Sequence, residues 1–220
     1  MVALFTIKKM TKVPDDVIFG IDEARNPINY GHVRAVTDEN RLIDLLRLRL
    51  LVFFIEQTQV LQNSGCAFPL ATMTCVGIET LGTIFITDNK DDTSFQFVEV
   101  LKKTDQTFGR KPNKKFFHQL QTIWSEKDLT KLDSYAKLTY RFFRNTMLHG
   151  YQAKGVYLSY EDTGTISIVE DLGYLKINPN WFWNSFKKYY SVAFDTARNG
   201  EKNSTYRLNC LKYIQGYLLA

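Results

Sequence analysis

The chain has 220 residues, 45% of them hydrophobic and 23% charged, which suits a globular protein with a substantial core. Three cysteines without a CxxC pair argue against a disulfide framework or a structural zinc site. The net charge of +5 is uneven, because residues 1–100 carry −4 and residues 101–220 carry +9. The basic half favours a polyanionic partner such as RNA, although a solvated lysine-rich surface has the same composition.

The N-terminus lacks the pattern of a secretory signal, and the longest apolar run, Leu50 to Ile55, is too short to span a bilayer. We therefore expect a cytoplasmic protein without a membrane partner. Residues 1–36 contain turn signals and are expected to be an irregular N-terminal segment. From Asp38, a capping residue, the periodicity changes and predicts a helix over 41–62. Apolar residues lie almost all round this helix, so it should be buried on several sides.

The rest of the chain continues as helices with one β-like interruption. Further helices are predicted from Pro69 to Phe85, over 94–103, 113–126 and 132–148, from Pro179 to Asn199, and over 203–218. Between them, Val156–Tyr160 and Thr165–Val169 alternate like strands around a turn, which predicts a β-hairpin at about 156–169, and residues 175–177 can add a short strand. The sequence thus predicts a mainly α fold, with a helical domain over 37–220 and a small β-hairpin insertion.

The most informative stretch is Arg144-Asn145-Thr146-Met147-Leu148-His149, at the end of the expected helix 132–148. At 100° per residue, Arg144 and His149 flank the outward face, and Arg141 lies between them. Leu138 and Leu148 also point largely outward, which suggests that a partner covers them. The core face of this helix then comprises Leu132, Tyr135, Ala136, Thr139, Phe143 and Met147.

This stretch holds the groups that RNA cleavage needs. His149 lies in the last helical turn, where the helix dipole stabilises the imidazolium, so it can act as an acid or a base near neutral pH. Arg144 can bind a phosphate, and Asn145 can orient the imidazole or contact a phosphate oxygen. A histidine that merely caps the helix has the same spacing, and spacing alone favours it.

One helix separates Arg144 and His149 by about 140°, which is poor geometry for joint action on one phosphate. Pairing two copies of the helix about a two-fold axis brings two arginines and two histidines into one cleft. If the site is catalytic, the geometry therefore predicts a homodimer formed through the motif helix.

The motif resembles the R-N-x-x-x-H signature of the HEPN superfamily. The apolar stretch from Ala71 to Glu79 resembles the second helix of its bundle, and the aromatic helix from Pro179 resembles the closing helix. The resemblance covers roughly residues 38–198. It implies a helical bundle that dimerises through the motif helices and cleaves RNA without a metal, often in toxin–antitoxin or phage defence systems.

On this resemblance, Arg144 and His149 would be catalytic and Asn145 auxiliary. We also expect Arg141 and Lys154 to bind RNA. No cofactor and no metal ligand set is expected. A possible partner besides RNA and a second copy is an antitoxin protein. Some HEPN proteins lack activity, so a non-catalytic module for dimerisation, nucleotide binding or partner binding is the alternative. Glu79 stays open: it either supports the site, faces solvent or pairs with an arginine.

Overall fold

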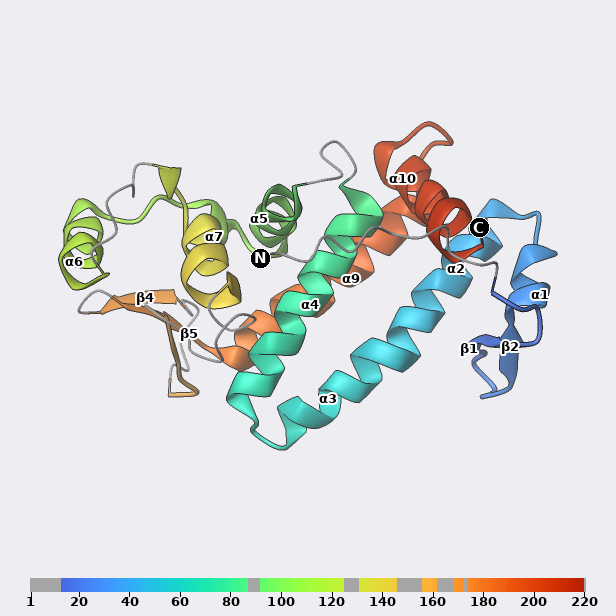
Figure 1. Ribbon diagram of the computed structural model, residues 1–220, viewed down its shortest axis with the longest axis horizontal. Coiled ribbons are helices and arrows are strands. Elements are labelled where there is room, and N and C mark those ends of the chain that lie inside the picture. Colours follow the sequence, from blue (N-terminus) through green and yellow to red (C-terminus); the bar gives the residue numbers. More distant parts are fainter. Residues whose placement is uncertain are drawn as a thin grey trace, which may run out of the picture. The chain divides into compact units, whose positions relative to one another are not determined.

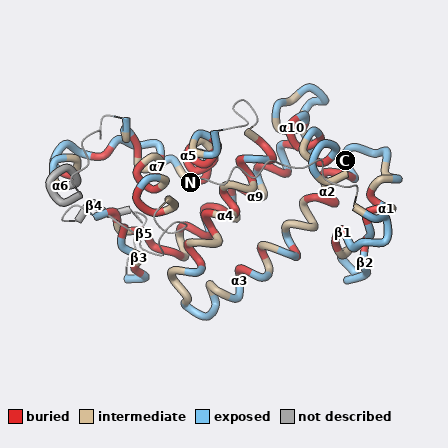
Figure 2. Tube along the Cα trace, in the orientation of Figure 1, coloured by how far each residue is buried: buried red, intermediate tan, exposed pale blue. Residues whose placement is uncertain are grey.

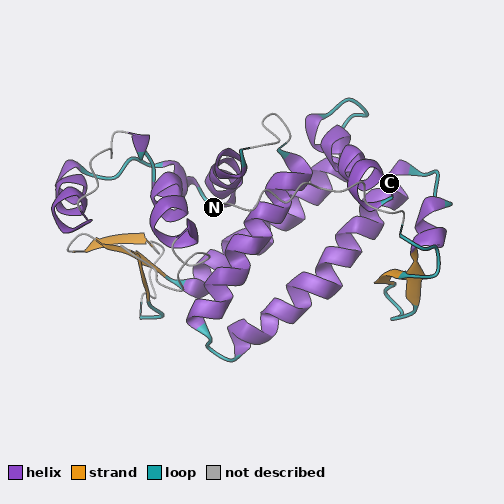
Figure 3. Ribbon diagram, in the orientation of Figure 1, coloured by secondary structure: helices purple, strands orange, loops and turns teal. Residues whose placement is uncertain are grey.

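The computed structural model describes residues 13–86, 92–124, 131–145, 156–161, 168–171 and 174–219. This part of the chain is mainly helical, which confirms the expected fold class at that level (Figures 1 and 3). The chain forms two compact units, one made of residues 1–56 with 194–220 and the other of residues 57–193. The boundaries between the units follow residues 56 and 193. The sequence had suggested a single boundary after residue 36.

Residues 13–36, the described part of the N-terminal segment, contain regular secondary structure. Strands β1 (Ile18–Ile21) and β2 (Pro27–Asn29) form an antiparallel pair, and α1 (Tyr30–Arg34) follows at once. The turn between the strands closes on Asp22, whose carboxylate accepts hydrogen bonds from Asn26 at 2.7 and 3.1 Å. The expectation of an irregular segment was wrong for residues 13–36, because strands of four and three residues are too short to show alternation.

The first unit also contains α2 (Glu39–Leu50), which continues without interruption into the π-helical turn η1 (Leu51–Ile55). Asp38 caps α2 as predicted, since its side chain accepts from the backbone N–H of Asn40 at 2.9 Å. The helices α10 (Thr205–Tyr213) and η5 (Ile214–Leu218) complete this unit together with the last residues of α9 (Pro179–Asn199).

Ion pairs tie α2 to the C-terminal helices of the same unit. They join Arg47 to Asp195 at 2.7 Å, Arg198 to Asp44 at 2.9 Å and Arg207 to Glu39 at 2.7 Å. The Arg207 side chain is only 8% exposed. Its guanidinium also donates to the carbonyl oxygens of residues 197 and 198, so it satisfies the free carbonyls at the end of α9.

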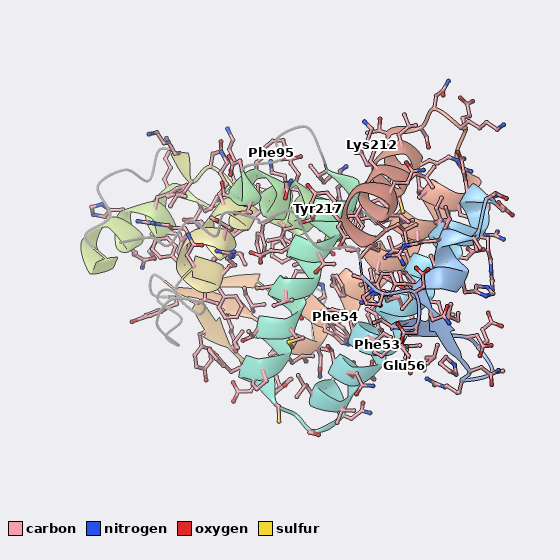
Figure 4. All side chains as sticks on the ribbon, turned by 45° about the vertical axis from the view of Figure 1, so that its right-hand side comes forward. Phe53, Phe54, Glu56, Phe95, Lys212 and Tyr217 are labelled. Carbon is pink, nitrogen blue, oxygen red and sulfur yellow. The ribbon has the colours of Figure 1, made fainter. Side chains whose placement is uncertain are left out.

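The apolar residues around α2 and η1 are not all buried. Leu42, Ile43 and Leu46 lie in the core, whereas Phe53 is 52% exposed on η1 (Figure 4). The guanidinium of Arg49 lies 5.8 Å from the Phe53 ring centroid and covers part of it. The prediction of a helix over 41–62 is confirmed, but the inference that it is buried on several sides was wrong at this turn.

The second unit is built around α4 (Ala67–Phe85), which follows α3 (Glu56–Asn63). Among the described residues, α4 is the one helix long and apolar enough to cross a membrane, and 56% of that stretch is buried inside the protein. It packs closely on α5 (Thr93–Thr104): a Cβ added at Gly82 would lie 3.0 Å from the Cβ of Gln96. Glycine at residue 82 thus lets the two helices approach.

An aromatic core links the remaining helices of this unit, and buried residues run along α4 and α9 (Figure 2). The helices are η2 (Gln106–Gly109), α6 (Lys114–Trp124), α7 (Tyr135–Leu138), η4 (Thr139–Arg144) and α9. Phe108 stacks on Trp181 at 5.2 Å, and Trp183 stacks on Phe186 at the same separation. Such ring pairs add to the burial of apolar area in stabilising the unit.

A three-stranded sheet stands where the sequence predicted a hairpin, but its pairing differs. Its strands are β3 (Val156–Leu158), β4 (Ile168–Asp171) and β5 (Tyr174–Ile177), in the order β3-β5-β4. The predicted hairpin of 156–169 was therefore wrong, since β3 pairs with β5 in parallel and β4 pairs with β5 antiparallel. Only residues 172 and 173 separate β4 from β5, which is the spacing that a hairpin favours.

Candidate active site

The motif helix begins at Ser134, whose hydroxyl accepts from the backbone N–H of Lys137 at 3.4 Å. α7 then passes into the π-helical turn η4, in which the N–H of Asn145 donates to the carbonyl of Tyr140, five residues back. π-Helical turns occur often at functional sites. The described part of this helix ends at Asn145, so the predicted residues His149 and Lys154 lie outside the described residues.

The side chain of Arg144 makes three contacts (the fold of this region is drawn in Figure 1). Its Nε donates to the carboxylate of Glu79, and its Nη1 donates to Asn145 Oδ1 at 3.0 Å. Its Cζ lies 5.3 Å from the centroid of the Tyr140 ring. Within the described part of the chain, no hydrogen-bond acceptor contacts Nη2. The guanidinium is therefore fixed in orientation and keeps one nitrogen for a further anion.

Glu79 reaches Arg144 from α4, 65 residues earlier in the sequence. The pair lies at the edge of the core, since its side chains are 15% exposed for Arg144 and 26% for Glu79. At this burial the Coulomb attraction is screened less than on the open surface, while each charge keeps part of its hydration. Glu79 therefore pairs with an arginine, which is one of the alternatives that the sequence left open.

Cys75 lies one helical turn before Glu79 and is 1% exposed. Burial raises the pKa of the Cys75 thiol well above its ordinary value, and the negative charge of Glu79 raises it further, while Arg144 lowers it. The sulfur beside the ion pair is thus a neutral thiol that packs as an apolar group. Within the described residues, no group of three His, Cys, Asp or Glu side chains could hold a metal ion.

The structure joins Arg144 and Asn145 by a hydrogen bond, whereas the sequence predicted that Asn145 orients the His149 imidazole or contacts a phosphate oxygen. Arg141 is exposed on the same turn. Leu138 does not point outward, because it is fully buried, and Phe142 is only 5% exposed. The expectation for Leu138 was wrong because α5, η2 and β3 all contact this helix, so it is covered on more than one side. An exposed leucine at residue 138 therefore no longer supports a dimer contact.

Two residues of the site carried no assigned role in the sequence. Tyr140 lies four residues before Arg144, a spacing that places both on one side of a helix, so the signal was present. Glu79 was a candidate, but its partner was not predictable, since no local spacing joins α4 to the motif helix. Together these residues turn an isolated arginine into an oriented one.

Comparison with models of known families, with curated proteins and with solved structures gave no match to this chain. A functional assignment therefore depends on the chemistry of the site itself.

Proposed function

We propose that this protein is a metal-independent endoribonuclease of the HEPN type, with Arg144 and His149 as its catalytic residues. The observation that carries the proposal is the orientation of Arg144 by Glu79, Asn145 and Tyr140 at the end of the motif helix. An arginine held in this way loses little side-chain entropy when it binds a phosphate, because its orientation is already set.

The proposed reaction is an internal transfer at phosphorus. One histidine takes the proton of the ribose 2′-hydroxyl, and the 2′-oxygen attacks the adjacent phosphorus to form a cyclic phosphate. A second histidine gives its proton to the departing 5′-oxygen. Arg144 stabilises the negative charge on the phosphate oxygens in the transition state. Because one chain offers one motif histidine, the acid and the base come from two copies of His149 across a two-fold axis.

Glu79 acts in this scheme as a positioning residue. It accepts from Nε of Arg144, while Nη1 donates to Asn145 and Nη2 is left for a phosphate oxygen. Arginine remains protonated beside any carboxylate, so the pair fixes direction without removing the cation. A glutamine at residue 79 would keep one hydrogen-bond acceptor but lose the charge.

The test is cleavage of a mixed RNA by purified protein in excess chelator. Wild type should produce fragments with cyclic phosphate ends. His149→Ala and Arg144→Ala should each abolish cleavage while their circular dichroism stays native. Arg141→Ala is the matched control on the same helix, and it should weaken binding and its salt dependence but retain cleavage at saturating RNA. Wild-type rates in the His149→Ala protein would falsify the catalytic assignment.

A second candidate is a non-catalytic module that dimerises or docks an antitoxin-like partner through the motif helix. The Glu79–Arg144 ion pair favours this second candidate, because Glu79 compensates the charge of Arg144 and the Arg144 side chain is only 15% exposed. In this case wild type should leave RNA intact in the same assay. Glu79→Gln and Arg144→Ala should then change the dimer dissociation constant in sedimentation equilibrium, whereas in the enzyme they change the cleavage rate first.

We place either activity in the cytoplasm, with toxin–antitoxin or phage defence as the proposed setting. The support is the free-thiol cysteine chemistry together with the resemblance of the motif. Expression of wild type and His149→Ala from a tightly controlled promoter tests the setting. Growth arrest by wild type alone is the result expected of an RNA-cleaving toxin.

A further inference from the structure

A cluster of cations precedes α6, at some distance in sequence from the motif. Arg110, Lys111, Lys114 and Lys115 lie within six residues, and all four are exposed. We call these four residues the basic cluster. Among the residues that the structure describes, none of the four has an ion-pair partner. Residues 102–119 contain six lysines and arginines and one acid, Asp105. The net charge of this stretch, +5, equals the net charge of the whole chain.

Four other cations of the same unit have carboxylate partners. The pairs are Lys102 with Glu99, Lys137 with Asp133, Arg144 with Glu79 and Lys176 with Glu161. The basic cluster differs from them, because like charges stand together without an acid. Like charges this close in the sequence repel one another. A bound polyanion would remove this repulsion, and it would release its own counterions.

The backbone under the basic cluster is anchored. Phe108 and Phe116 are 0% and 1% exposed, and Pro112 between them is buried as well. The side chain of Asn113 caps α6 by accepting from the N–H of Phe116 at 2.8 Å. Apolar residues between the cations are thus buried, while the four cations themselves stay exposed.

The basic cluster is also joined directly to the motif helix. The carbonyl oxygen of Arg110 accepts from the backbone N–H of Tyr135 at 3.1 Å, at the first residue of α7. From Tyr135 the helix runs nine residues to Arg144, a path of about 13 Å at 1.5 Å per residue. A strand of a few nucleotides is long enough to contact both ends of this helix.

We propose that the basic cluster binds the phosphates of single-stranded RNA outside the motif and holds the strand along α7 and η4. The identity of the polyanion rests on the proposed function, whereas binding itself needs no cleavage. A membrane surface is disfavoured, because a helix that lies on lipid needs exposed apolar residues, and among the described side chains of this region Phe108 and Phe116 are buried. The contacts are to the backbone, so binding should be indifferent to base sequence.

The test uses a fluorescein-labelled oligouridylate of about 20 nucleotides and protein carrying His149→Ala, so that no RNA is cleaved during the measurement. Affinity is measured by anisotropy between about 50 and 300 mM KCl. Changing all four residues of the basic cluster to glutamine should weaken binding at least tenfold at the lowest salt. It should also lower the slope of log K against log salt by up to about 3, at about 0.7 for each phosphate that the protein no longer neutralises.

The matched control changes four other exposed cations to glutamine and so removes the same amount of charge. They are Arg41, Lys188, Lys202 and Lys212. This variant should change the slope by less than about 1. Equal effects in both variants would overturn the proposal, because net charge alone would explain them. Weaker binding to phosphatidylserine vesicles with RNA affinity unchanged would also overturn it. If wild type does not cleave but the two variants differ as stated, the basic cluster stands and the ribonuclease does not.

Discussion

Replacing Glu79 with glutamine should destabilise the unit of residues 57–193 by about 1–3 kcal/mol. The estimate follows from burial, since breaking a fully buried pair costs about 3–5 kcal/mol and an exposed pair about 0–1. The Glu79–Arg144 pair lies between these limits, with side chains 26% and 15% exposed. A destabilisation of about 2 kcal/mol corresponds to a fall in Tm of roughly 4–8 °C for a chain of this length.

The assay is urea unfolding followed by tryptophan fluorescence, which reports this unit because all three tryptophans lie within residues 57–193. A double-mutant cycle of Glu79→Gln and Arg144→Met separates the pair from other effects and should give a coupling of about 1–2 kcal/mol. Asp133 and Lys137 form the control pair: they are exposed, lie 3.1 Å apart and should couple by less than about 0.5 kcal/mol. Equal coupling in the two cycles would refute the argument from burial.

Three further predictions concern stability and reactivity. The pKa of Asp92, the N-cap of α5, is lowered by the hydrogen bond from the Ser94 hydroxyl and by helix N–H groups. The ionised cap therefore stabilises the folded protein fully above about pH 4, and this stabilisation is lost as the pH falls through the lowered pKa. Asp92→Asn should remove that pH dependence from thermal melts between about pH 6 and pH 3, because asparagine caps without a charge. Gly82→Ala should destabilise by about 1 kcal/mol in urea because the new methyl meets Gln96, whereas Gly216→Ala, with open space around it, should stabilise slightly. In a thiol titration at about pH 8, Cys66 should react in the native protein, and the two buried cysteines should react only in denaturant.

The long helices were predictable from the sequence because their signals are local. The apolar period and Asp38 marked α2, Pro179 and Asn199 marked α9, and the structure places all of these as expected. The sheet was not predictable, since β3 pairs in parallel with β5 and Val156 lies opposite Leu175, with β4 between them in the sequence. Turn signals report neighbouring strands, and they carry no information on a pairing over this distance.

The candidate site was predictable only along one helix. The adjacency of Arg144 and Asn145 followed from their positions, and the ring of Tyr140 could have been inferred from i,i+4 spacing. The carboxylate of Glu79 could not, because its contact joins two helices through tertiary packing. The outward placement of Leu138 failed for the same physical reason: a helical wheel shows which residues share a face but not how many faces are covered.

The discontinuity of the first unit has a consequence for synthesis on the ribosome. Residues 57–193 form a contiguous unit and can fold as soon as they emerge, whereas residues 1–56 must await residues 194–220. At about 5–20 residues per second, this wait lasts on the order of ten seconds. During that time the carboxylate of Glu39 lacks Arg207, and the apolar side of α2 lacks its C-terminal cover. Residues 1–56 therefore spend this interval without the C-terminal helices that complete their unit.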